Sequence, residues 1–136
     1  MGQQQLLLII LGSVIVGIAI TVGFSMFTSQ SSATNRDEIA NEMVHFASLA
    51  QGYYRRPRVL GGGGGSFNGL TLQFLTRHTP NLNGSYTMSP NPVSGAAAFF
   101  TLTGVGTELG NNGTDNVKVV MQVYADSIKV DTSSGN

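Results

Sequence analysis

Residues 6–27 read LLLIILGSVIVGIAITVGFSMF, an apolar run on which the architecture of the whole chain depends. The run has 22 residues (27 − 5) and no charged side chain, and the first charged side chain of the protein is Arg36. As an α-helix, a segment of this length extends about 33 Å, enough to cross a hydrocarbon core of ~30 Å. We therefore expect residues 6–27, called the apolar segment below, to lie in lipid, against other protein, or in each in turn.

The helix is expected to continue beyond the apolar segment with a different pattern. Residues 28–34 are polar, but neither proline nor glycine interrupts them. Pro57 lacks an amide donor, which places the end of the helix near Arg56. The sequence thus predicts one helix over about residues 3–55. Apolar residues then recur every three or four positions and predict an amphipathic helix: Ile39, Met43, Phe46, Ala50 and Tyr53, with Val44, Ala47 and Tyr54 widening the stripe.

Short alternating segments follow a glycine run at residues 61–65. Five of them are predicted strands: 70–74, 85–89, 97–103, 117–124 and 127–131. The last two are separated only by Ala125-Asp126, which predicts a hairpin. The fold class is therefore α+β, with a small antiparallel sheet whose apolar face packs on the C-terminal half of the helix. We expect three parts: an apolar helix (1–34), its amphipathic continuation (35–58) and a β-rich head (59–136).

Composition narrows the classes of function. Seven basic and seven acidic residues give a net charge of zero, so nothing in the charge balance predicts a nucleic-acid partner. Cysteine is absent, which excludes thiolate nucleophiles and cysteine metal sites. His45 and His78 are isolated, without paired carboxylates. The sequence therefore predicts no enzyme, no cofactor, no metal site and no small-molecule substrate.

Small residues in the apolar segment favour packing against other helices. Ser13, Gly17, Thr21 and Ser25 fall four residues apart and form what we call the small-residue ridge, which would let helix backbones approach closely. No lysine or arginine lies close to either end of the segment, as one usually does in a permanent membrane span. The residues expected to pack in a bundle of such helices are Leu6, Leu7, Ile10, Ser13, Val14, Gly17, Ile18, Thr21, Phe24 and Ser25.

A short polar N-terminus, an uninterrupted apolar helix, its amphipathic continuation and a β-rich head together resemble type IV pilins and the related pseudopilins. The resemblance implies a subunit that is first inserted in the inner membrane. Pilus-type assembly machinery would then extract it and polymerise it with itself into an extracellular filament at the cell surface.

The resemblance also implies polar contacts between subunits. Bacterial pilins usually carry a glutamate near the mature N-terminus, and here Gln3, Gln4 and Gln5 would supply hydrogen bonds in its place. Cationic side chains would meet carboxylates such as Asp37, Glu38 or Glu42 of a neighbouring subunit. The candidate cations are Arg36, Arg55 and Arg56, with Arg58 close by.

Two other interpretations stay open at this point. The chain could be a binding domain on a single-pass membrane anchor that never polymerises, or a minor pseudopilin of a secretion system.

The glycine run is not a P-loop, because Ser66 is followed by Phe67 and no lysine precedes Ser66. Two N-glycosylation sequons lie in predicted surface loops: Asn83-Gly84-Ser85 and Asn112-Gly113-Thr114.

Overall fold

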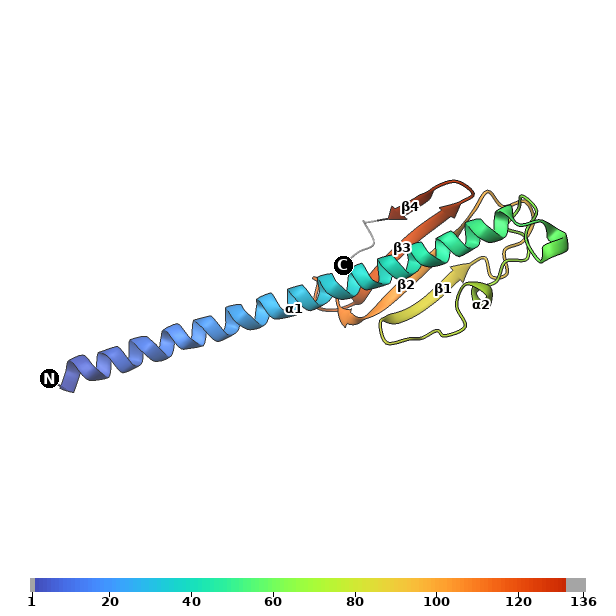
Figure 1. Ribbon diagram of the computed structural model, residues 1–136. Helices are drawn as coiled ribbons and strands as arrows, with labels where there is room; N and C mark the ends of the chain where they lie inside the picture. The colour runs from blue at the N-terminus through green and yellow to red at the C-terminus, as the bar shows by residue number, and fades with distance from the viewer. Residues whose placement is uncertain (1, 132–136) are drawn as a thin grey trace. The chain divides into compact units, whose positions relative to one another are not determined.

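The computed structural model describes residues 2–131. Met1 and residues 132–136, the outer ends of the expected ranges 1–34 and 59–136, lie outside the described residues. Helix α1 spans Gly2–Arg55, which confirms the predicted long helix (Figure 1). The chain divides into two compact units, Met1–Ser31 and Ser32–Asn136, and each is described by itself.

The first unit is the N-terminal part of α1. The helix is regular through the polar residues 28–34, since none of them is a glycine or proline that would break the hydrogen-bond ladder. By length and composition, α1 can cross a membrane.

The second unit, called the head unit below (described residues 32–131), combines the C-terminal half of α1 with a four-stranded sheet. All neighbouring strands pair antiparallel in the order β1-β2-β3-β4. Residues of α1 from Ser32 onward lie along one face of this sheet (Figure 1). The α+β class with an antiparallel sheet packed on the helix is thus confirmed. The strands are β1 (Gly84–Ser89), β2 (Phe99–Leu109), β3 (Asn116–Tyr124) and β4 (Ile128–Asp131).

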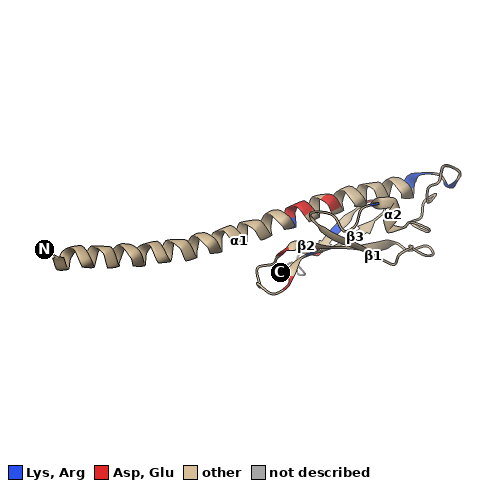
Figure 2. Cartoon of the chain, turned by 90° about the horizontal axis from the view of Figure 1, so that it is seen from below, with Lys and Arg blue, Asp and Glu red and all other residues tan. Residues whose placement is uncertain are grey.

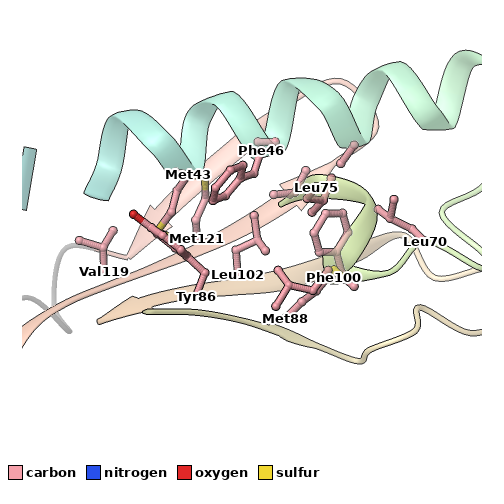
Figure 3. Packing of buried hydrophobic residues seen from close by; sticks show 14 of the residues in the cluster. Met43, Phe46, Leu70, Leu75, Tyr86, Met88, Phe100, Leu102, Val119 and Met121 are labelled. Carbon is pink, nitrogen blue, oxygen red and sulfur yellow. The ribbon is translucent and has the colours of Figure 1, made fainter. Parts of the chain in front are cut away.

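The core of the head unit lies between α1 and the sheet (Figure 3). Alternate strand residues face α1 and are buried, as expected for a sheet with one solvated face. Aromatic rings join the layers: Phe46 of α1 packs edge-on against Tyr86 of β1, with ring centroids 5.1 Å apart. The largest fully buried side chains are Phe67, Phe100, Ile39, Met43, Leu70, Leu102, Met121, Val93, Val117 and Val123.

One predicted strand is wrong. Residues 70–74 do not extend as a strand, and Leu72–Leu75 form the short helix α2 instead. Leu72 and Leu75 are both buried, and their spacing of three places them on one side of a helical turn. The amide of Leu72 donates to the Asn91 side chain at 3.2 Å. Leu70 and Leu72 imitate strand alternation, but the burial of Leu75 requires a helical turn.

Strand β2 is longer than the predicted segment 97–103, because it runs on to Leu109. Gly104 and Gly106 look like strand-breaking residues in the sequence, but both lie within β2 on the face toward α1. A Cβ atom at Gly104 would lie 2.4 Å from Cγ2 of Ile39, and one at Gly106 would lie 2.0 Å from Oδ1 of Asn35. Glycine at these two positions therefore allows α1 to lie directly on the strand backbone.

The glycine run folds back on the end of α1. The amides of Gly63, Gly64 and Gly65 donate to the carbonyls of Tyr53, Arg56 and Tyr54, at 2.8, 2.9 and 2.8 Å. Tyr53 and Tyr54 belong to the last turn of α1 and Arg56 directly follows it, at the end where helix carbonyls run short of amide donors. The 3₁₀ turn Arg58–Leu60 connects the helix to the run. The run is thus a tightly packed helix cap.

The outer edge of β1 is bordered by the loop before it. The Thr79 hydroxyl accepts from the amide of Tyr86 at 3.0 Å and donates to the Tyr86 carbonyl at 3.4 Å. The backbone amide of Asn81 donates to the Gly84 carbonyl at 2.8 Å, and Oδ1 of Asn81 accepts from the Gly84 amide at 3.0 Å. Thr79 and Asn81 therefore satisfy strand groups that have no neighbouring strand.

Candidate functional site

The candidate site is the surface of the apolar segment. Every residue from Gly2 to Gln30 is exposed. The large apolar side chains between Leu6 and Phe27 are 53–71% exposed among the described residues. A contiguous apolar surface of this kind is typical of contact with lipid or with other protein.

Hydroxyl groups in this part of α1 are satisfied within the helix. Ser13 donates to the carbonyl of Ile10 at 2.8 Å, and Thr21 donates to that of Ile18 at 2.8 Å. Thr28 makes the same kind of bond, to Ser25 at 3.0 Å. Because these donors already have acceptors, the small-residue ridge can leave water without losing a hydrogen bond from Ser13 or Thr21.

Three glycines of the apolar segment are not required by any contact with residues 2–131. A Cβ atom at Gly12, Gly17 or Gly23 would meet nothing within 4 Å. Glycine inside a helix costs about 1 kcal/mol relative to alanine. This contrasts with Gly104 and Gly106, where a side chain would collide with α1. The three glycines together therefore reduce the stability of the helix by about 3 kcal/mol relative to alanine, and no contact with the described residues offsets this.

The residues predicted to join helix and sheet lie in the head unit. Ile39, Met43, Phe46 and Ala50 are buried, and Tyr53 is half-buried against the core. The three residues expected to widen the stripe differ in burial. Ala47 is buried and Tyr54 is half-buried, but Val44 is 47% exposed, so the stripe is narrower on that side than expected.

The residues predicted to make inter-subunit polar contacts lie at three places along α1. Gln3, Gln4 and Gln5 are exposed in the first unit. In the head unit, Arg55 and Arg56 are exposed and Arg36 is half-buried. Lysine, arginine, aspartate and glutamate are absent from the first part of α1 (Figure 2). In its head-unit part, Arg36 comes first, the carboxylates Asp37, Glu38 and Glu42 follow, and Arg55 ends the helix.

Glu42 has partners in its own chain, which the sequence did not indicate. Its carboxylate accepts hydrogen bonds from Tyr86 (2.5 Å), Asn81 (2.8 Å) and Asn83 (2.6 Å). Burial by itself raises the pKa of Glu42, but the three hydrogen bonds outweigh it, and the pKa lies below its ordinary value. Burial and the bond to Glu42 raise the pKa of Tyr86. Glu42 therefore fixes α1 to the loop before β1, and Asp37 and Glu38 are the exposed carboxylates nearby.

Ser32 and Asn35 are buried polar residues that sequence reasoning also missed. Pairing between β2 and β3 is irregular between Val105 and Leu109. Asn35 accepts from the amide of Glu108 at 3.3 Å, and the Ser32 hydroxyl donates to the carbonyl of Leu109. These side chains supply partners that the strand loses at the irregularity. Positions 32, 35, 39, 43 and 46 continue one helical stripe, and that periodicity is the signal that could have found them.

The described part of the head unit has an open depression beside α2. Within residues 2–131, no group of three or more histidine, aspartate or glutamate side chains is placed to hold a metal. The depression has a volume of about 480 Å³. Its lining contains one cation and no carboxylate or histidine that could act as a general base: Thr71, Gln73, Phe74 and Arg77.

Comparison of the chain with protein-family models, with curated proteins and with solved structures finds no match.

Proposed function

We propose that the chain is the structural subunit of a type IV pilus-like extracellular filament, in which the apolar segments of many copies bundle together. The observation that carries the proposal is the fully exposed apolar segment with glycines that serve no contact within the chain. Helices that pack closely on one another use small residues in this way.

Burial of the apolar segment supplies the driving force for assembly. A large apolar side chain gains about 1.5–3 kcal/mol when it leaves water. Summed over the segment, this is tens of kcal/mol before the entropy of ordering is subtracted. The described residues do not cover the segment, so the cover would come from lipid or from other protein, and in this proposal from other copies of the chain. We infer a precursor inserted in the inner membrane, which assembly machinery then moves into the filament.

Charge placement supports a staggered arrangement of parallel copies. All copies inserted in one membrane point the same way, so unstaggered neighbours would place Asp37 beside Asp37 and Arg55 beside Arg55. An axial shift of about 18 residues, or ~27 Å, would instead bring Asp37 and Glu38 level with Arg55 and Arg56. Gln3, Gln4 and Gln5 would make hydrogen bonds among neighbouring N-termini.

Electron microscopy of material sheared from the cell surface tests the proposal. Regular fibres composed of this chain are the expected result. The Gly17→Leu variant should insert in the membrane normally but form few or no fibres, because leucine fills the thin place between helices. Ile15→Leu is the matched control, since it keeps both volume and apolarity, and it should assemble.

The competing function is a binding domain on a single-pass membrane anchor, and the length of the apolar helix is equally compatible with it. In that case the protein would appear only in detergent extracts of membranes. Gly17→Leu and Ile15→Leu would then behave alike, and this result would contradict the filament proposal.

A further inference from the structure

The two sequons of the chain, Asn83-Gly84-Ser85 and Asn112-Gly113-Thr114, have different surroundings in the head unit. Both have glycine at the middle position, and they differ at the third, which is Ser85 in one and Thr114 in the other. An acceptor asparagine must present its amide nitrogen to a transferase and leave room for a bulky glycan. The structure meets these requirements at one sequon and not at the other.

Asn83 is held inside the head unit. Its amide nitrogen donates to the Glu42 carboxylate at 2.6 Å, and its backbone carbonyl accepts from the Asn35 side chain at 2.9 Å. The next residue, Gly84, is buried in β1, where a Cβ atom would lie 2.2 Å from the carbonyl of Val105. A glycan on Asn83 would break a charge-assisted hydrogen bond and push against a paired strand.

Asn112 lies in an exposed turn between β2 and β3. The turn is closed by backbone bonds from Gly110 to Asp115 (2.8 Å) and from Gly113 to Gly110 (2.9 Å). The Asn112 amide nitrogen donates to the exposed Asp115 carboxylate at 3.1 Å. Water can replace this bond at little cost, so the nitrogen is available without disturbing the core.

We propose that Asn112 is an N-glycosylation site of the folded protein and that Asn83 is not. The donor is an oligosaccharide carried on a lipid diphosphate. The Asn112 amide nitrogen forms a bond to the anomeric carbon of the sugar as the bond from that carbon to the diphosphate oxygen breaks. The lipid diphosphate leaves with the electron pair, and the amide loses one proton to a base of the transferase. In cells, the inference rests on the proposed function, because glycan transfer requires the head unit to lie outside the cytoplasm.

A reconstituted reaction tests the site without any need for filament assembly. The folded full-length chain in detergent micelles is incubated with a single-subunit oligosaccharyltransferase and a fluorescent lipid-diphosphate oligosaccharide. Intact mass is expected to increase by one glycan, and peptide mass spectrometry should place it on Asn112. Asn112→Gln and Thr114→Ala should each abolish the shift, whereas Asn83→Gln and Ser85→Ala should retain it.

Two controls keep the result decisive. A synthetic peptide of residues 107–118 shows that the enzyme accepts this sequon out of its fold. The Asn112→Gln chain, unfolded in urea and diluted into the reaction, should become modified at Asn83, which shows that the fold protects this residue. Modification of Asn83 in the folded chain, or no modification of Asn112 while the peptide reacts, would overturn the proposal. Neither outcome would affect the filament proposal.

Discussion

Ile39 of α1 packs directly on the backbone of Gly104 in β2, so closely that a Cβ atom at Gly104 would lie 2.4 Å from Cγ2 of the isoleucine. Sδ of Met43 would lie 2.9 Å from the same added Cβ atom. The contact joins the two layers of the head unit at its centre. The separation between helix and sheet is therefore set by a residue without a side chain.

Replacement of Gly104 by alanine should destabilise the head unit by about 1–3 kcal/mol, because the added methyl group overpacks a well-filled core. The measurement is chemical unfolding of the full chain in detergent, followed by near-ultraviolet circular dichroism of the tyrosines. Gly52→Ala is the matched control. Gly52 lies in α1 with nothing within 4 Å of an added Cβ, so this change should stabilise by about 1 kcal/mol. Equal effects at both positions would contradict the close contact.

The hydrogen bonds to Glu42 should make stability depend on pH in the acid range. The pKa of Glu42 in the folded protein is lowered from 4.5, so the folded state releases this proton more readily than the unfolded state. The stabilisation is complete above about pH 4.5 and is lost as the pH falls through the folded pKa. The Glu42→Gln variant should lose about 1–3 kcal/mol at neutral pH.

Unfolding free energies measured between pH 7 and pH 3 check this prediction. The difference between the native chain and Glu42→Gln should shrink as the pH falls. Glu108→Gln serves as the control, because Glu108 is exposed on β2, and it should leave the acid dependence in place. A constant difference at all pH values would show that the carboxylate charge is not involved.

The glycine cap on α1 should tolerate substitution only where a side chain has room. A Cβ atom at Gly63 would lie 1.7 Å from the carbonyl oxygen of Ser66, so Gly63→Ala should displace the loop and destabilise by several kcal/mol. Gly61 has φ +76°, with nothing within 4 Å. Asparagine adopts this left-handed conformation more readily than other side chains, so Gly61→Asn should cost less than about 1 kcal/mol. Thermal unfolding of both variants distinguishes a packed cap from a flexible linker, in which the two would be equally mild.

The head unit should remain folded without the apolar segment. A chain that begins at Ser32 retains the stripe on α1 and the core between helix and sheet. It should be monomeric and soluble without detergent, with antiparallel strand signals by circular dichroism. Analytical ultracentrifugation checks the mass. Aggregation of this shortened chain would show that the sheet depends on residues before Ser32.

The long helix was predictable because its evidence is local and repeated. Apolar periodicity, the lack of breakers and the single stop at Pro57 act over neighbouring residues. Strand β3 was predictable for a similar reason, since its alternation is regular from Val117 to Tyr124. Strand β2 was only half predicted. Nothing in the residues around Gly104 predicts a strand there. The position requires glycine because of a contact with Ile39, which lies 65 residues earlier (104 − 39).

The candidate site shows the same division. The apolar segment could be recognised from composition alone, because no charged side chain interrupts it. The Glu42 hydrogen bonds could not be recognised, since their partners lie 39–44 residues away and carry no motif. The partner of the apolar segment could not be recognised either, because in the proposed filament the contact that explains Gly12, Gly17 and Gly23 would be made by another molecule.

The hydrogen bonds of Thr79 and Asn81 along β1 matter most where molecules are crowded. An open strand edge is a template for the edge of another sheet, and fusion of sheets leads to aggregation. Here the edge groups of Gly84 and Tyr86 are already occupied, and the opposite border of the sheet is the four-residue strand β4. In the proposed filament, many copies would be held at high local concentration by their helices while their sheets stay separate, so that association would remain confined to one part of the molecule.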